Sequence, residues 1–222
     1  MSTRHLPVRP DLIQLKHQAK DLLREMKRGN PRAKLADAQF ALARSYGVVS
    51  WPRLVVACHV VDAIWEDDAE RLRAIVTKRP ALLHEMALAR EGSNWGPPMS
   101  YAANLGRDRI IRMLWELGAR DLAHAAGRAA LQGKIDTARM IHELAGRPPQ
   151  PVDAVMGPCE TLNAEGLAYV LEMGAPIADR NGDWRAPVAM ILETYCRKPD
   201  GKHRCLELLA GRGIALPDTP PM

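Results

Sequence analysis

The sequence predicts an all-α protein, and two observations favour that class. Apolar residues recur at spacings of three and four along several segments, which is the period of an α-helix with one buried face. Proline and glycine stand near the ends of these segments, where a helix tolerates them. We expect three helices in the first quarter of the 222 residues and shorter helical stretches beyond about residue 62.

The N-terminal segment, residues 1–61, contains the three expected helices. The first spans residues 10–29, between Pro10 and Gly29, and the second spans residues 31–46. The third begins with Ser50 as its N-cap and carries apolar residues as far as Val61. The apolar stripe of the first helix consists of Leu12, Leu15, Ala19, Leu22 and Met26.

The basic excess of the chain lies in this segment. Residues 1–56 hold eleven Lys and Arg against four Asp and Glu, a net charge of +7, whereas the whole chain has a net charge of +5. Four of these cations form a stripe opposite the apolar face of the first helix. The stripe fits either a solvated helix face or a surface for nucleic acid or another anionic ligand. These cations are Lys16, Lys20, Arg24 and Lys27.

Beyond residue 62, short helical stretches end at glycines that are regularly spaced. The first three closing glycines, Gly118, Gly146 and Gly174, are 28 residues apart, and Gly213 follows after 39. A fixed period of this size is typical of repeat proteins.

The stretch Gly96–Ala119, GPPMSYAANLGRDRIIRMLWELGA, resembles an ankyrin repeat. Ser100 and Pro97 stand where that family has His and Thr, so the hydrogen bonds of those family residues are not expected here. Residues on the first half of the family pattern are Pro98, Met99, Ala102, Ala103 and Gly106; those on the second half are Ile110, Ile111, Leu114, Gly118 and Ala119.

Four further stretches resemble the second helix of that repeat. They cover residues 67–83, 133–146, 163–175 and 202–214, with Leu162 in place of a leading glycine before the third and Gly201 matched to Gly106 before the fourth. The resemblance implies an α-solenoid of about five degenerate ankyrin-like helix pairs over residues 62–216, because such pairs bury their apolar faces only by stacking.

The two ends of the chain add to this resemblance. The segment 1–61 is similar to a helical extension that precedes ankyrin units in many bacterial proteins, which implies a bacterial cytoplasmic setting. The tail 217–222 contains Thr219-Pro220-Pro221-Met222, which is similar to the start of a unit at Gly96. We therefore expect the chain to be a fragment that ends as a sixth repeat begins.

The sequence predicts no catalytic residue, cofactor site or metal site. Cys196, His203 and Cys205 lack an ordinary zinc spacing, and Cys205 takes an inward position on its helix. The segment Asp179–Asp183 begins like a calcium loop but has Trp184 where that loop requires glycine, so we interpret it as a turn. We also expect no membrane-spanning segment and a cytoplasmic location, since neither a long apolar run nor an export signal is present.

Two tryptophans occupy one register of the repeat. Trp95 lies three residues before Pro98, and Trp184 lies three before Pro187. Either they anchor a protein partner, since tryptophan is frequent among binding hot spots, or they fill gaps left by shortened hairpins. The predicted partner-binding residues are Asn94, Trp95, Tyr101, Asn104, Arg180, Asn181, Asp183 and Trp184.

These features favour a non-enzymatic scaffold that binds a protein through the concave face of ankyrin repeats. The alternative is a nucleic-acid or anionic-ligand binder that uses the basic first helix. A third, enzymatic interpretation requires a pocket between the N-terminal extension and the first repeats, lined by converging polar groups.

Overall fold

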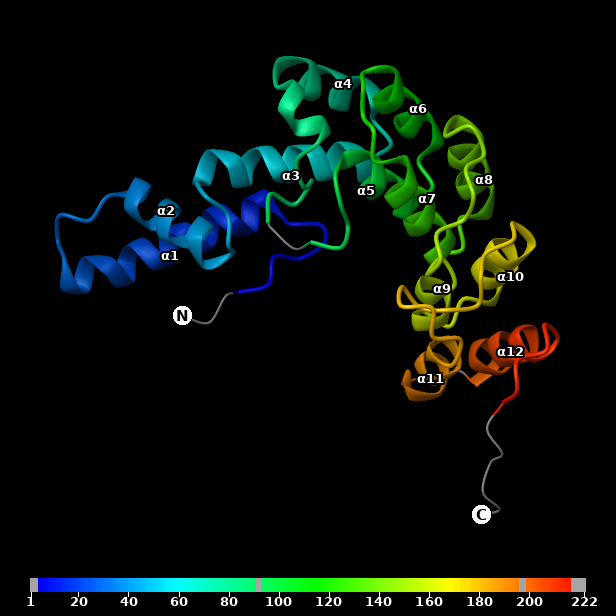
Figure 1. Cartoon of the computed structure of the whole chain (residues 1–222). Helices are drawn as coiled ribbons and strands as arrows, with labels where there is room; N and C mark the ends of the chain where they lie inside the picture. The colour runs from blue at the N-terminus through cyan, green and yellow to red at the C-terminus, as the bar shows by residue number, and fades with distance from the viewer. Residues whose placement is uncertain (1–3, 91–92, 196–198, 217–222) are drawn as a thin grey trace, which may run out of the picture. The chain divides into compact units, whose positions relative to one another are not determined.

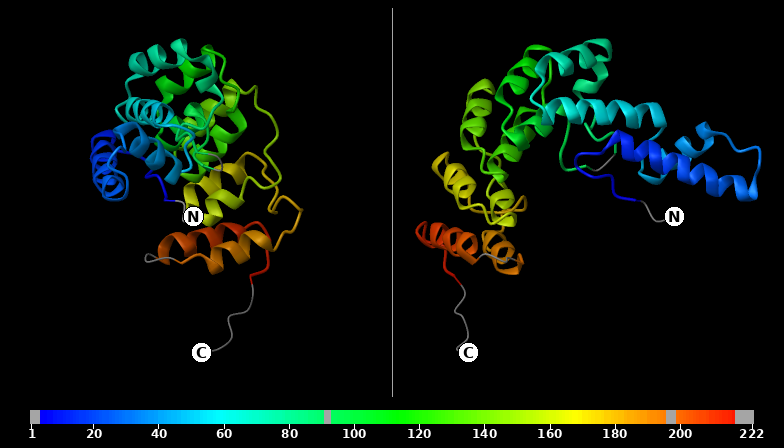
Figure 2. Two further views of the ribbon diagram at one scale, coloured as in Figure 1. Left: turned by 90° about the vertical axis from the view of Figure 1, so that its left-hand side faces the viewer. Right: turned by 180° about the vertical axis from the view of Figure 1, so that it is seen from behind.

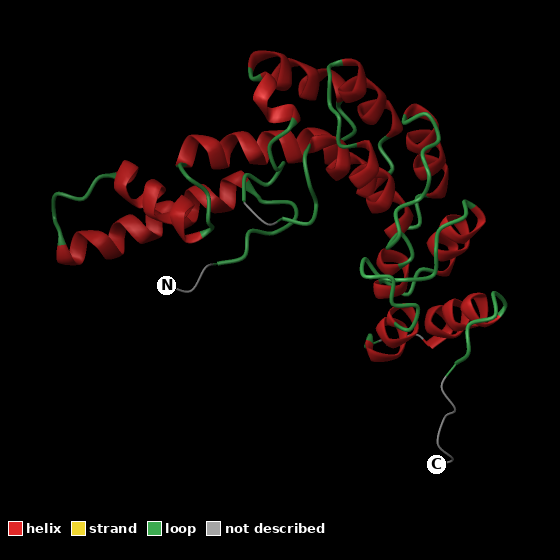
Figure 3. Cartoon of the chain, in the orientation of Figure 1, coloured by secondary structure: helices red, strands yellow, loops and turns green. Residues whose placement is uncertain are grey.

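The chain is all-helical wherever the structure describes it, which confirms the predicted class. The computed structural model describes residues 4–90, 93–195 and 199–216. These residues form twelve α-helices and one short 3₁₀ helix, with no strand among them (Figures 1 and 3). The expected tail at 217–222 and the candidate ligand Cys196 lie outside the described residues.

The helices belong to two compact units. The N-terminal unit comprises Met1–Ala102 and Arg109–Arg120, and the C-terminal unit comprises Ala103–Asp108 and Asp121–Met222. Helix α5, Pro98–Leu105, has residues in both. The N-terminal unit contains α1 (Leu12–Gly29), α2 (Leu35–Ser45), α3 (Trp51–Trp65), α4 (Ala69–Lys78), the 3₁₀ helix η1 (Pro80–Leu83) and α6 (Asp108–Glu116) except its first residue. The C-terminal unit contains α7 (Leu122–Leu131), α8 (Ile135–Leu144), α9 (Met156–Glu160), α10 (Ala164–Glu172), α11 (Ala186–Glu193) and α12 (Pro199–Ala210).

The three predicted N-terminal helices are present, with different bounds. Asp11 caps α1 by accepting hydrogen bonds from the backbone N–H of Ile13 and Gln14, and Ser50 caps α3 through Arg53 as predicted. Helix α2 begins four residues later than expected, because the chain first turns at Asn30, whose side-chain oxygen accepts the N–H of Arg32 at 3.1 Å. Helix α3 continues to Trp65, beyond the expected Val61.

Helix α3 is the central element of the N-terminal unit. Seven of its residues are buried, and they point to more than one side, which is typical of a helix surrounded by other elements. The extended residues before α1 are also fixed to this unit: the N–H of Arg4 donates to the carbonyl of Ser45 at 2.8 Å, and Arg9 forms ion pairs with Asp62 and Glu66, each at 3.2 Å. The segment ahead of the first helix therefore contributes to packing.

Helices α4 and α6 occupy stretches that the sequence interprets as second helices of repeats. Asp68 caps α4 by accepting the N–H of Arg71 at 2.9 Å, and its negative charge is favourable at the N-terminus of the helix. Most of the apolar residues expected to face inward on these helices are buried: Leu72 and Val76 on α4, and Ile110, Ile111 and Leu114 on α6. Ile75 on α4, also expected to face inward, is only partly buried.

The C-terminal unit is a succession of helix pairs, α7 with α8, α9 with α10, and α11 with α12. The last pair lies side by side in both views of Figure 2. The predicted closing glycines Gly146, Gly174 and Gly213 follow α8, α10 and α12 with φ between +79° and +83°, a conformation that ends a helix and favours glycine. Leu162 has φ +53° in the turn before α10, and Gly106 and Gly133 have φ +68° in the turns before α6 and α8. Leu162 therefore takes the backbone conformation of the leading glycine that it replaces in the predicted pattern.

The third residue of each later second helix meets the preceding pair. On α8, Thr137 donates to the carboxylate of Asp108 at 2.6 Å. On α10 and α12, Gly166 and Gly201 stand so close to the carbonyl oxygens of Ala130 and Leu162 that an added Cβ would lie 2.1 and 2.7 Å from them. The sequence matched Gly201 to the turn residue Gly106, and this is wrong, because α12 already begins at Pro199.

Candidate functional site

The segment Asp179–Asp183 is a turn, as predicted, and its shape is set by one carboxylate. Asp179 accepts hydrogen bonds from the N–H of Asn181 at 2.8 Å, from its side-chain amide at 3.1 Å, and from the N–H of Asp183 at 2.9 Å. The hydrogen bond from Asp183, with those from Asn181, lowers the pKa of Asp179. Gly182 completes the turn at φ +81°.

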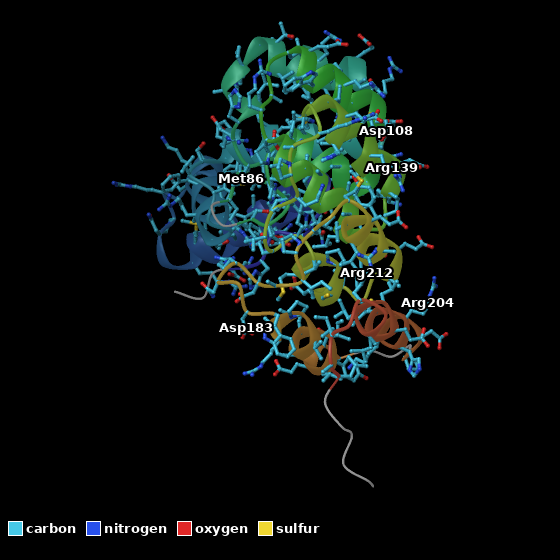
Figure 4. The ribbon with its side chains drawn as sticks, turned by 45° about the vertical axis from the view of Figure 1, so that its right-hand side comes forward. Met86, Asp108, Arg139, Asp183, Arg204 and Arg212 are labelled. Atoms are coloured by element: carbon cyan, nitrogen blue, oxygen red, sulfur yellow. The ribbon has the colours of Figure 1, made fainter. Side chains whose placement is uncertain are left out.

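This turn presents Trp184 to solvent. The Trp184 side chain is 46% exposed, and the guanidinium of Arg185 lies 5.2 Å from the centroid of its ring. Asp183, labelled in Figure 4, accepts the N–H of Arg185 at 2.9 Å. Arg180 and Asn181 are exposed on the same turn. Four of the predicted partner-binding residues therefore lie on one exposed turn that is held by hydrogen bonds to Asp179.

Trp95, at the matching register, is packed inside the N-terminal unit. Its ring centroid lies 4.7 Å from that of Tyr101, and the ring is only partly exposed. Tyr101 is fully buried; its hydroxyl accepts from the indole N–H of Trp65 at 3.0 Å and donates to the carbonyl of Val8. This environment favours the gap-filling interpretation for Trp95.

Tyr101 and Asn104 have buried side chains, although the sequence includes them among the contact residues. Burial raises the pKa of Tyr101 to about 12. Asn104 is 3% exposed and accepts a hydrogen bond from Nε of Arg128 at 2.8 Å within the C-terminal unit. Both side chains are thus engaged inside their units, while Asn94 is exposed.

The basic stripe of α1 lies on the exposed side of that helix. Lys16, Lys20, Arg24 and Lys27 are all exposed, and the buried residues of α1 are Leu15 and Ala19. Arg24 forms an ion pair with Asp21 at 2.6 Å. Acidic side chains are therefore interspersed with the stripe.

A cavity in the C-terminal unit has no counterpart among the sequence predictions. It encloses about 420 Å³ between α7, the connection 148–154, α9 and α10. Its polar groups include His124, whose pKa is lowered first by burial and then by Arg128, and Tyr169, whose pKa is raised by burial. The cavity is bordered by small residues on α7 and by prolines in the connection. A cavity of this kind cannot be predicted from the helical periodicity of the sequence.

A second cavity, of about 540 Å³, lies within the N-terminal unit, between the extension and the segment after η1. It is the kind of pocket that the enzymatic interpretation requires. Its polar side chains are Arg44, Arg53, Arg90 and Glu85, of which Arg53 and Glu85 form an ion pair at 2.7 Å. Three guanidiniums and a paired carboxylate are suited to binding an anion more than to transferring a proton.

The described thiols are buried and unreactive in character. Burial raises the pKa of Cys58 and Cys159 to about 12 and that of Cys205 to about 11, so their thiolate forms are rare at neutral pH. Cys205 faces inward as predicted.

The described residues contain neither a metal-binding cluster nor a membrane-spanning helix. No group of three or more His, Cys, Asp or Glu side chains there has the arrangement of a metal site. None of the helices they form combines the length and the apolar character needed to span a bilayer.

A scan against protein-family models, a search of curated proteins and a search of solved structures each gave no match to this chain.

Proposed function

We propose that this chain is a non-enzymatic protein-binding scaffold, built from ankyrin-like helix pairs, whose partner contacts the turn around Trp184. The observation that carries this proposal is the exposed Trp184–Arg185 pair on a turn held by Asp179. Tryptophan and arginine dominate the energetics of protein interfaces, and a preorganised turn lowers the entropy lost on binding.

The regular stacking in the C-terminal unit supports the scaffold part of this proposal. The third residues of α8, α10 and α12, which are Thr137, Gly166 and Gly201, lie against Asp108, Ala130 and Leu162, each at or near the turn between two earlier helices. Repeat proteins are held together by such nearest-neighbour contacts, which leave the turns and exposed helix faces free to vary. A surface residue such as Trp184 then serves binding without being needed for folding.

The proposal is tested by comparing three forms of the protein: wild type, Trp184→Ala and Tyr195→Ala. Tyr195 is 84% exposed in the same unit and serves as the matched control. Each form is used to capture proteins from a lysate of the source organism. A protein retained by wild type and Tyr195→Ala but lost by Trp184→Ala is then purified, and its affinity for all three is measured by calorimetry.

We expect Trp184→Ala to weaken binding by about 2 kcal/mol or more, the loss typical of a hot-spot tryptophan. Because the side chain is 46% exposed, circular dichroism and the melting temperature should change little. Identical captured proteins for Trp184→Ala and wild type would refute the role of this turn.

The second candidate function uses the basic face of α1, whose four cations are all exposed. It predicts binding to duplex or single-stranded nucleic acid that decreases steeply with salt. Reversing Lys16 and Lys20 to Glu should then abolish that binding. Absence of any binding by the wild type at low salt would remove this candidate.

A further inference from the structure

The arginine cavity of the N-terminal unit is lined by Arg53, a largely buried side chain with one guanidinium nitrogen that makes no hydrogen bond to any described residue. Arg53, in the first turn of α3, directs Nε and Nη2 to one carboxylate oxygen of Glu85, at 2.9 and 2.7 Å, and Nη2 also donates to the carbonyl of Met86 at 3.2 Å. Its remaining nitrogen, Nη1, is buried and has no hydrogen-bond partner in the described part of the chain. A buried donor without an acceptor is costly, and an acceptor that reached Nη1 would relieve that cost.

Two further arginines line the same cavity. Arg44 stands exposed in the last turn of α2, and Arg90 is held in place by a 3.2 Å contact with Nδ1 of His5. Among the described residues that line the cavity, Glu85 is the one carboxylate, and it is already paired with Arg53. The described lining side chains therefore carry two positive charges more than negative ones.

The rest of the lining is small or apolar. Gly47, at φ +74°, leaves backbone exposed at one side, and Val49, Met86 and Ala89 supply an apolar wall. The side chain of Val49 is 64% exposed, so it is accessible to a ligand. Met86 is labelled in Figure 4. A volume of about 540 Å³ is larger than an inorganic phosphate requires and is within the range of small-molecule sites.

We propose that this cavity binds a small phosphomonoester, with the phosphate at Arg44, Arg53 and Arg90 and an organic group against Val49 and Met86. A phosphomonoester carries close to two negative charges at neutral pH, which matches the excess of the lining. Arginine suits this role because its planar fork matches the oxygens of phosphate. The site is independent of the protein-binding turn in the other unit.

The experiment measures binding of phenyl phosphate, inorganic phosphate and benzoate to the full chain by calorimetry at fixed salt. Phenyl phosphate and benzoate share a ring and differ in charge, whereas inorganic phosphate lacks the ring. We expect phenyl phosphate to bind best and benzoate worst. Benzoate binding as tightly as phenyl phosphate would overturn the dianion assignment, and inorganic phosphate binding as tightly would overturn the role of the apolar wall.

Two matched variants locate the site. Arg44→Gln removes an exposed arginine in the last turn of α2, and Arg28→Gln removes an exposed arginine in the last turn of α1, outside the cavity. Losing one charge-assisted hydrogen bond should weaken phenyl phosphate binding about tenfold in Arg44→Gln. Arg28→Gln should bind as wild type does. Equal weakening in both, or no binding to the wild type at millimolar concentration, would refute the site.

Discussion

Replacing Gly166 with alanine tests the stacking of α10 on α7. An added Cβ would lie 2.1 Å from the carbonyl oxygen of Ala130 and 3.1 Å from its carbon. The distance from the added Cβ to that oxygen is 1.3 Å shorter than the 3.4 Å at which ordinary van der Waals contact begins. Both atoms belong to the backbone, so a change of side-chain rotamer cannot relieve the clash. The two helices have to separate.

Two effects of opposite sign determine the change in the free energy of unfolding. Alanine in place of glycine stabilises a helix interior by roughly 1 kcal/mol. Forcing a methyl group into filled space costs roughly 1–3 kcal/mol, and a backbone clash falls at the upper end of that range. We therefore expect Gly166→Ala to lower the free energy of unfolding by about 1–2 kcal/mol.

Gly127, on α7 of the same unit, provides the matched control. An added Cβ at Gly127 would meet no heavy atom within 4 Å, so alanine there should stabilise by up to roughly 1 kcal/mol. Gly201→Ala should fall between the two, because its Cβ would lie 2.7 Å from the carbonyl oxygen of Leu162.

The assay is urea unfolding followed by far-UV circular dichroism, with midpoints compared at equal slope. The expected order of midpoints is Gly127→Ala, wild type, Gly201→Ala and Gly166→Ala, from highest to lowest. A midpoint for Gly166→Ala at or above that of wild type would show that α10 does not approach α7 as described.

Three further predictions concern buried polar groups. Tyr101→Phe should lower the free energy of unfolding by roughly 1–3 kcal/mol, because it removes the two part-buried hydrogen bonds that the Tyr101 hydroxyl makes with Trp65 and Val8, whereas Tyr195→Phe, at an exposed ring, should not. The pKa of Tyr101 is about 12 in the folded chain against 10.0 as the reference, so the unfolded chain loses this proton first. Wild-type stability should therefore fall between pH 10 and pH 12, and fall less in Tyr101→Phe, as measured by urea unfolding at each pH. In a Cys196→Ser variant, the buried thiols Cys58 and Cys159 should react with a disulfide reagent at pH 8 only after urea is added; reaction in the native protein at the unfolded rate would refute their burial.

Local features of the fold are predictable from sequence because their causes are local. Ser50 caps α3 through an N–H three residues away, and Gly146 and Gly174 end α8 and α10 through their own backbone conformation. Leu162 is identified as a turn residue by register alone, although leucine is unfavourable at φ +53°. In each case the residues that determine the structure lie within a few positions of one another.

The cavities and the close backbone contacts have causes that are distant in sequence. The orphaned nitrogen of Arg53 depends on Glu85 and Met86, more than thirty residues away. The start of α12 at Pro199 places Gly201 inside a helix, against a carbonyl that belongs to Leu162. Helical periodicity identifies which face of a helix is buried, and it carries no information about which residue of another element that face meets.

The two tryptophans show how one neighbouring residue separates a packed side chain from an exposed one. They share a register, yet Trp95 packs on the Tyr101 ring at 4.7 Å, whereas Trp184 is 46% exposed. The sequence differs six residues after each tryptophan: Tyr101 follows Trp95, whereas Met190 follows Trp184. A tyrosine can hold a neighbouring indole by ring contact and can use its hydroxyl to join Trp65 and Val8, and methionine has neither group. The residue at that position therefore separates a tryptophan used for packing from one that remains available to a partner.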